Sequence, residues 1–444
     1  MKKFISSIQD IWKIEELRNK IILTLGLMVV YRLAAQIPLP GIDPSQLAGI
    51  ANKTQDGLLG LLNAFTGGAF AKASVMALGI MPYISASIVV QLMGIAVPYL
   101  QKLQKEGESG RKKINQITRW LTIAILLIQA PAYIVSLPTL GIPESAFLLG
   151  HGPLFYFSSI LLLTTGTVFA MWLGEKITDK GIGNGISLLI MIGIIARFPG
   201  SFAQEFTSRI TQSNGGLIMI LIEIVIWFIV IFLSIMLVTA VRKIQVQYAR
   251  RTVAGSIQDV AGARQYIPLK LNSSGVMPII FAQALMFVPG LLASSENSAL
   301  KSFGVAFTDM FGLWYNLLFA ALIIIFSYFY TAITIPTNKM ADDLKRGGGF
   351  VPGIRPGKDT ADYLDTILSR ITLPGSIFLA ALAILPAIFI KLGVQPGWAM
   401  FYGGTSLLIM VGVAIDTLQQ INAHLLNRHY DGLMKAGSKR KLQY

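Results

Sequence analysis

The chain has 444 residues, of which 54% are apolar and 13% are charged. Soluble domains carry roughly 25% charged residues, so this composition excludes a soluble globular protein and indicates an integral membrane protein. The chain has no cysteine and only three histidines, which excludes disulfides and a thiolate- or histidine-bound metal centre. Its net charge of +15 has to lie mainly in the segments between apolar spans.

Residues 1–20 place apolar side chains at helical spacing, with Lys2, Lys3 and Lys13 on other faces. This pattern predicts an amphipathic helix on the membrane surface. A solvated N-terminal helix would show the same spacing.

Ten apolar segments of spanning length follow. They lie at 21–38, 74–97, 114–136, 153–174, 183–200, 216–241, 275–293, 311–336, 371–391 and 398–420. The intervening stretches are too short for a nucleotide-hydrolysing domain, because domains have at least about 50 residues.

Five spans lie on each side of a polar stretch, so an arrangement in two halves is possible. The halves would be residues 21–200 and 216–420, with an external segment at 201–215 between them and a basic cytoplasmic tail at 421–444. An odd number of spans in each half permits an inverted repeat.

The segment 57–70 is apolar but is too short to span a membrane. It reads either as a re-entrant helix, which would require a protein-lined cavity around it, or as an amphipathic loop outside the membrane. Its spacing favours neither interpretation.

The basic residues divide unevenly between the two sides of the membrane. With a cytoplasmic N-terminus, 30 of the 37 basic residues lie in cytoplasmic segments and 6 lie in external ones. The positive-inside rule therefore predicts that both termini are cytoplasmic.

One helical stripe in the second span changes from apolar to polar. Ile80, Ile84, Ser87 and Gln91 are spaced to share a face. A helix that lines a narrow apolar constriction would show this pattern, and so would ordinary contact between helices.

The long basic loops 98–119, 242–274 and 339–370 are predicted to bind either anionic lipid headgroups or a docking partner, including an RNA-rich one. Phosphate-binding loops and zinc-protease motifs are absent from the sequence. We find no nucleophile–base pair either, so we predict no enzymatic activity and no cofactor.

Several longer motifs resemble the SecY family of protein-conducting channel subunits. They are PLPGID (38–43), NAFTGG (63–68), GIMPYISASIVVQL (79–92), KEGESGRKKINQ (105–116), GIGNGIS (181–187), FVPGIRPG (350–357) and YGGTSLLI (402–409). The resemblance implies an all-α integral membrane protein with ten transmembrane helices in two pseudo-symmetric inverted halves. It also implies an external hinge at 201–215 between the halves and a short re-entrant plug helix at 57–70.

The resemblance also assigns site residues. A pore ring falls on Ile80, Ile84, Ile190, Ile280 and Ile409, and the plug includes Asn63, Phe65, Gly67 and Gly68. A lateral gate, through which a signal sequence would enter lipid, maps to Ser85, Ser87, Gln91, Gln129 and Gln283. Partner docking maps to Arg355 and, in a loop that departs from the usual family pattern, to Arg250, Arg251 and Arg264.

The resemblance implies a channel of the bacterial plasma (inner) membrane that passes unfolded, signal-bearing polypeptides and releases hydrophobic segments laterally into lipid. The implied partners are the SecE and SecG subunits, the SecA ATPase, the ribosome, signal peptides and nascent polypeptides, anionic lipids, and YidC and SecDF. The alternative is an inverted-repeat secondary transporter, which would typically carry more ionisable residues inside its spans.

Overall fold

The computed structural model describes residues 12–47, 63, 66–138, 143–148, 150, 152–211, 216–248, 265–286, 307 and 309–440. The chain divides into two compact units. The first unit holds residues 1–208, 396–398 and 413–444, and the second holds 209–395 and 399–412. Each unit is described by itself.

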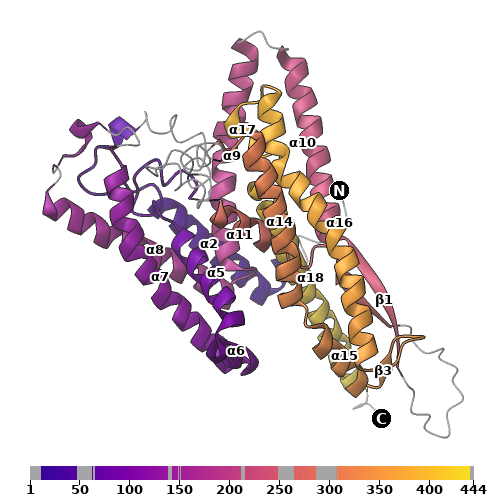
Figure 1. Cartoon of the computed structure of the whole chain (residues 1–444). Helices are drawn as coiled ribbons and strands as arrows, with labels where there is room; N and C mark the ends of the chain where they lie inside the picture. The colour runs from indigo at the N-terminus through magenta and orange to yellow at the C-terminus, as the bar shows by residue number, and fades with distance from the viewer. Residues whose placement is uncertain are drawn as a thin grey trace, which may run out of the picture. The chain divides into compact units, whose positions relative to one another are not determined.

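Among the described residues, the regular elements of the first unit are all helices, and turns connect them (Figure 1). Its elements are α2 (Glu15–Ala34), η1 (Pro44–Leu47), α5 (Met81–Ala96), α6 (Pro98–Lys105), α7 (Glu108–Ser136), η2 (Glu144–Ala146), α8 (Pro153–Lys180), most of α9 (Gly185–Thr211), most of α17 (Pro396–Ala399) and the part of α18 (Gly404–Arg440) that begins at residue 413.

A buried apolar cluster holds the outer segments of the first unit against α7 and α8. It includes Leu39, Ile42, Phe70, Ala71, Tyr133, Phe147 and Phe155. Two aromatic pairs within it pack edge to face. The ring centroids of Phe70 and Tyr133 are 4.9 Å apart, and those of Phe147 and Phe155 are 5.6 Å apart. Such T-shaped pairs add about 0.5–1.5 kcal/mol each to the free energy gained by burial.

The second unit combines long helices with strands. Its elements are α10 (Gly216–Thr239), β1 (Val241–Tyr248), β2 (Gln265–Lys270), α11 (Met277–Leu285), α14 (Leu313–Thr334), α15 (Thr337–Arg346), β3 (Gly349–Phe350), α16 (Lys358–Lys391) and the first turns of α18. Helix α14 packs against both α11 and α16.

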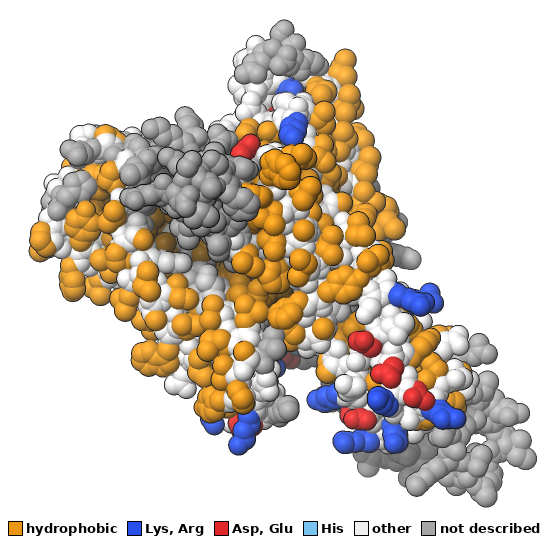
Figure 2. Space-filling view, viewed as in Figure 1, with side chains coloured by type: hydrophobic (Ala, Val, Ile, Leu, Met, Phe, Trp, Pro, Cys, Tyr) orange, Lys and Arg blue, Asp and Glu red, His pale blue; other side chains and the backbone are white. Residues whose placement is uncertain are grey.

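Figure 2 shows hydrophobic side chains along α10 and α14, whereas charged side chains gather over α15 and the start of α16. Helix α10 has a mean hydropathy of 3.0, and Leu217, Ile218 and Leu221 on it are 64–75% exposed. Exposed side chains of this kind fit a face that contacts lipid.

The three strands form one antiparallel sheet in the order β2-β1-β3. This sheet adds an element that the all-α prediction lacks, and it lies partly in the segment 242–274 that the sequence predicts to be a loop. Lys243 pairs with Pro268. Because Leu271 N donates to Ala240 O, alternation along the ladder places Pro268 at a non-hydrogen-bonded pair, where its missing N–H costs nothing.

The two other predicted loops also contain regular structure. Residues 98–119 form α6 and the beginning of α7, and residues 339–370 contain most of α15, β3 and the beginning of α16. Helix α9 continues to Thr211, so most of the expected hinge at 201–215 is helical. The helix α5 begins at Met81, which leaves the first residues of the predicted span 74–97 in turns.

Among the described residues, seven helices are long and apolar enough to span a membrane, or eight if the bent pair Met81–Gly94 and Pro98–Gln104 counts as one span. The first and seventh predicted spans correspond to α2, which carries charged residues in its first turns, and to α11, which ends at Leu285. With these two, a helix is found within each of the ten predicted spans.

Candidate channel and docking sites

The candidate pore-ring residues belong to four helices. In the first unit, Ile80 precedes α5, Ile84 lies one turn further on, and Ile190 lies on α9. In the second unit, Ile280 lies on α11 and Ile409 on α18. Ile80, Ile190 and Ile409 are buried, and the other two are half-buried. All five are branched aliphatic side chains, so none offers a polar group to a passing polypeptide.

The candidate lateral-gate residues are placed differently from one another. Ser85, Ser87 and Gln91 lie half-buried on α5, and Gln91 Nε2 donates to Ser87 Oγ at 3.3 Å. Gln129 is exposed on α7, whereas Gln283 is buried and its Nε2 donates to Thr405 Oγ1 at 3.1 Å within the second unit. Each of these two hydrogen bonds lies within a single unit, and neutral hydrogen bonds of this kind contribute about 1 kcal/mol each.

The candidate plug residues lie at the edge of a tightly bonded turn. Asn63 is 3% exposed, and its Oδ1 accepts a hydrogen bond from Ala71 N at 3.1 Å. Residues 66–70, including Gly67 and Gly68, form turns rather than the helix that the sequence predicts for them. Phe65 and residues 57–62 lie outside the described residues.

In the second unit, two segments that the sequence separates pack into one small body, which we call the strand platform. It consists of β1, β2, β3, α15 and the first turns of α16. Ile244 on β1 and Leu269 on β2 share a buried cluster with Val351, Leu364 and Leu368. The platform therefore has its own apolar core.

Arg355 lies on the exposed turn that leads into α16. Thr360 Oγ1, in the first turn of α16, donates a hydrogen bond to the Arg355 carbonyl oxygen at 2.8 Å. This bond holds the backbone of Arg355 against the start of the helix, while the guanidinium faces solvent. Arg250, Arg251 and Arg264 lie outside the described residues.

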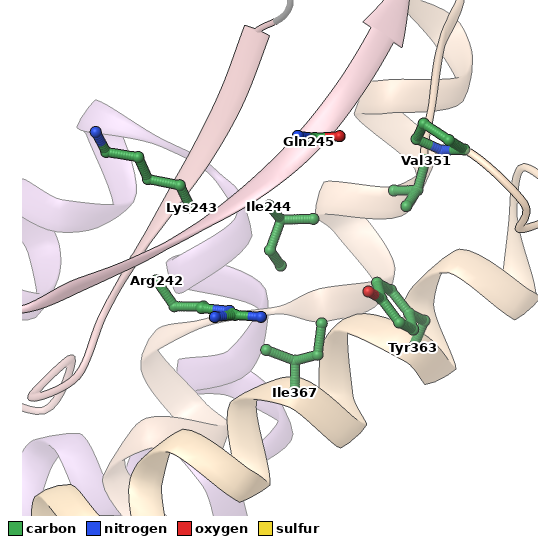
Figure 3. Close-up of a pocket in the computed structure, with 8 residues that line it drawn as sticks. Arg242, Lys243, Ile244, Gln245, Val351, Tyr363 and Ile367 are labelled. Carbon is green, nitrogen blue, oxygen red and sulfur yellow. The ribbon is translucent and has the colours of Figure 1, made fainter.

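A cavity of about 370 Å³ opens in the strand platform between β1 and α16. Figure 3 shows Arg242 and the hydroxyl of Tyr363 directed toward the space beside Ile367, whereas Lys243 points away. The cavity combines an apolar wall with one guanidinium. Sequence reasoning missed this cavity, because its walls come from segments about 110 residues apart.

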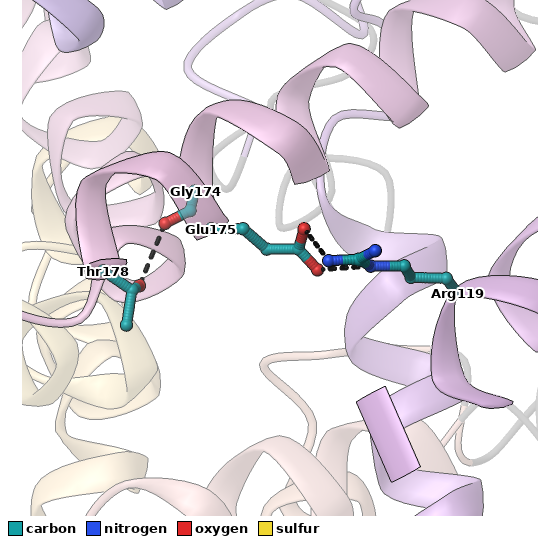
Figure 4. Close-up of polar contacts among 4 residues, drawn as sticks. All are labelled: Arg119, Gly174, Glu175 and Thr178. Carbon is teal, nitrogen blue, oxygen red and sulfur yellow. Dashed lines mark hydrogen bonds and ion pairs between the residues drawn. The ribbon is translucent and has the colours of Figure 1, made fainter. Parts of the chain in front are cut away.

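An ion pair joins α7 to α8 in the first unit (Figure 4). Arg119 Nε and Nη2 donate to the two carboxylate oxygens of Glu175 at 2.8 and 2.6 Å. One turn further, Thr178 Oγ1 donates to Gly174 O and accepts from Gly185 N, both at 2.9 Å. These contacts fix the junction between α8 and α9.

A buried ion pair joins the end of α9 to the start of α10 in the second unit. Arg209 Nη2 lies 2.7 Å from Glu223 Oε1, and the two side chains are 6% and 5% exposed. Their separation of 14 residues crosses the end of α9 and the start of α10, so sequence spacing alone did not predict this contact.

Comparison with known proteins gives the same family across nearly the whole chain. The family model described as SecY matches residues 74–418. The protein translocase subunit SecY of Mycobacterium bovis is 39% identical over 455 residues, covering 98% of this chain and 100% of that relative. The chain belongs to the SecY family.

Solved structures agree with this assignment at the level of the fold. A SecY channel whose plug domain stabilises its closed state has a TM-score of 0.61 and 18% identity, covering 91% of each chain. Sec61 in a canine ribosome–channel complex has a TM-score of 0.55 and 17% identity, again covering 91% of each chain. The chain is thus a protein-conducting channel of the SecY family, and the transporter alternative is not favoured.

Proposed function

We propose that this chain forms the pore of a protein translocase in a bacterial plasma membrane, passing unfolded polypeptides that carry a signal sequence. The observation that carries the proposal is the branched aliphatic side chain at each of the five candidate pore-ring positions. Ile80, Ile84, Ile190, Ile280 and Ile409 would form a ring that excludes ions by dewetting and yields around a peptide.

The same proposal assigns the segment 57–70 as a plug and the polar residues of α5, α7 and α11 as a lateral gate. The plug domain of the solved SecY channel supports the first assignment. Apolar signal sequences of 7–15 residues would leave through the gate into lipid.

The chain contains no nucleotide-binding loop, so a partner has to supply the driving force. We assign the strand platform and Arg355 to docking of SecA or the ribosome, with SecE and SecG as membrane subunits. The canine ribosome–channel complex that contains Sec61 supports this choice. The surface over α15 and the start of α16 carries both Lys/Arg and Asp/Glu side chains, and its basic side chains would supply the contacts to an anionic partner.

The ring is tested by Ile409→Asn in the purified channel complex reconstituted into planar bilayers. An amide at this buried position would hydrate the constriction, so we expect a several-fold increase in ion conductance without substrate. We also expect export of a substrate with a defective signal sequence to increase. Leu408→Asn, one position away on the same helix, controls for general damage; equal conductance of Ile409→Asn and the native channel would contradict the ring.

A further inference from the structure

Arg32 places a guanidinium near the end of α2, inside the first predicted span. The side chain is half-buried and lies in the last turn of the helix. Its Nη1 donates a hydrogen bond to the carbonyl oxygen of Gly67 at 3.2 Å. A charged group close to hydrocarbon needs hydrogen-bond acceptors to offset its lost hydration. The carbonyl oxygen of Gly67 is such an acceptor for the Arg32 guanidinium.

Gly67 fits this position only because it has no side chain. Its φ is +63°, in the left-handed region. A Cβ there would lie 2.3 Å from Arg32 Nη1 and 2.8 Å from the Cα of Gly193 on α9. Gly67 is therefore held where α2, α9 and the turn 66–70 meet in the first unit.

The chain that follows Gly67 is firmly fixed. Tyr133 Oη donates to Phe70 O at 2.8 Å, Leu39 N donates to Ala73 O at 2.9 Å, and Val75 N donates to Ile37 O at 2.9 Å. Before Gly67, the side chains of Asn63 and Thr66 accept hydrogen bonds from Ala71 N and Phe70 N, within the same segment. The contact with Arg32 thus ties the turn 66–70 to a separate helix at the point where the fixed base begins.

We propose that Arg32 is a positioning residue for the base of the plug: its guanidinium holds the Gly67 carbonyl and ties the turn 66–70 to α2. This inference rests on the proposed role of 57–70 as a plug.

The absence of cysteine in the native chain makes site-directed labelling clean. Ala71 is 6% exposed in the apolar cluster of the first unit and lies just beyond the turn. In the reconstituted complex with Ala71→Cys as the only thiol, we would measure the rate of modification by a membrane-impermeant maleimide. Arg32→Gln should raise this rate about tenfold, as expected for loss of a hydrogen bond to a charged group, and Arg32→Lys should restore part of the protection.

Two controls separate positioning from general damage. Lys72→Gln removes a second cation near the same turn, one that is exposed and donates a hydrogen bond to Gln36 Oε1, and it should leave the rate unchanged. Ala130→Cys, 0% exposed on α7, should stay protected in the Arg32→Gln background. An unchanged rate at Ala71→Cys, an equal effect of Lys72→Gln, or equal deprotection of Ala130→Cys would each overturn the proposal.

A separate measurement tests the function on which the inference rests. Ion conductance without substrate should increase in a variant that lacks residues 57–62 and, to a smaller extent, in Arg32→Gln. If the deletion variant seals as well as the native complex, the plug role fails whatever the labelling shows. If the deletion variant leaks while Arg32→Gln neither leaks nor labels faster, the plug role stands and the role of Arg32 fails.

Discussion

At the scale of single residues, charge inside the spans is sparse, and two of the buried or half-buried charges make specific contacts. Arg32 binds a backbone carbonyl, and Glu223 binds Arg209. Desolvating a lone charge costs several kcal/mol, whereas a well-paired one recovers most of that cost. Two ionisable residues that lie inside predicted spans thus join separate segments.

The pair of Arg209 and Glu223 gives a stability prediction. Arg209→Met should lower the free energy of unfolding by about 3–5 kcal/mol, because it leaves the Glu223 carboxylate buried without its cation. The double variant Arg209→Met/Glu223→Leu should recover much of this loss. Thermal unfolding of the complex in detergent would measure both, and a double variant as unstable as the single one would contradict the explanation.

Arg355 gives a prediction about partner-driven export. Reversing its charge with Arg355→Glu should reduce SecA-driven translocation into vesicles by about tenfold or more, since like charges brought together at a docking surface cost several kcal/mol. The level and thermal stability of the complex should not change, because the side chain is exposed. Lys391→Glu, exposed at the other end of α16, is the matched control. Normal translocation by Arg355→Glu would remove Arg355 from the docking surface.

At the scale of elements, the spans were predictable and the connections were not. Hydrophobic runs of about 20 residues are required to cross a bilayer, so helices occur within all ten predicted spans. The connections were predicted to be irregular because Gly and Pro interrupt them, as in the stretch 347–357. Alternation of Ile244 and Val246 with Gln245 and Gln247 was a strand signal already present in the sequence.

The candidate site residues likewise divide into those that could be placed from the sequence and those that could not. Positions on spans, such as Ile84 and Ile190, could be placed on helices from the sequence. The cavity beside Arg242 and the contact of Gln283 with Thr405 could not, because they depend on packing between segments that are distant in sequence. Pairwise packing of this kind leaves no periodic pattern in a single chain.

The junction of α8 and α9 provides an element-scale prediction. A Cβ on Gly185 would lie 1.9 Å from the Gly174 carbonyl oxygen, a backbone atom that cannot rotate away. Gly185→Ala should therefore destabilise the fold by about 1–3 kcal/mol. Gly200→Ala on the same helix meets nothing within 4 Å and should be neutral or stabilise by up to about 1 kcal/mol. Thermal unfolding measures both, and equal effects would contradict this packing.

At the scale of the whole molecule, the net charge of +15 has a direction. Sorting the charges by side predicts a strongly basic cytoplasmic face and an external face without net charge. Such a distribution would fix orientation during insertion. It would also leave the predicted conduit nearly uncharged, so that acidic and basic segments of a polypeptide could both pass.

This orientation can be tested with single cysteines in the cysteine-free chain. Glu108→Cys at the exposed start of α7 should react with an impermeant thiol reagent only in inverted vesicles. Leu148→Cys, 72% exposed beyond the other end of α7, should react only in right-side-out vesicles. Reaction of both from the same side would overturn the topology.

The first unit is built from the N-terminal half of the chain and from residues 396–398 and 413–444, so its last parts are synthesised long after its first. Gly183 N donates to Gln420 Oε1 at 2.8 Å, and Trp398 packs against Phe198 and Phe202. At about 5–20 residues per second, a ribosome needs roughly 10–40 seconds to proceed from the last N-terminal residue of this unit to residue 413. During most of this time residues 396–398 and 413–444 have not yet been synthesised, and the interval is longer than a small domain takes to fold. During that interval the nascent unit is a natural client for chaperones and for quality-control proteases.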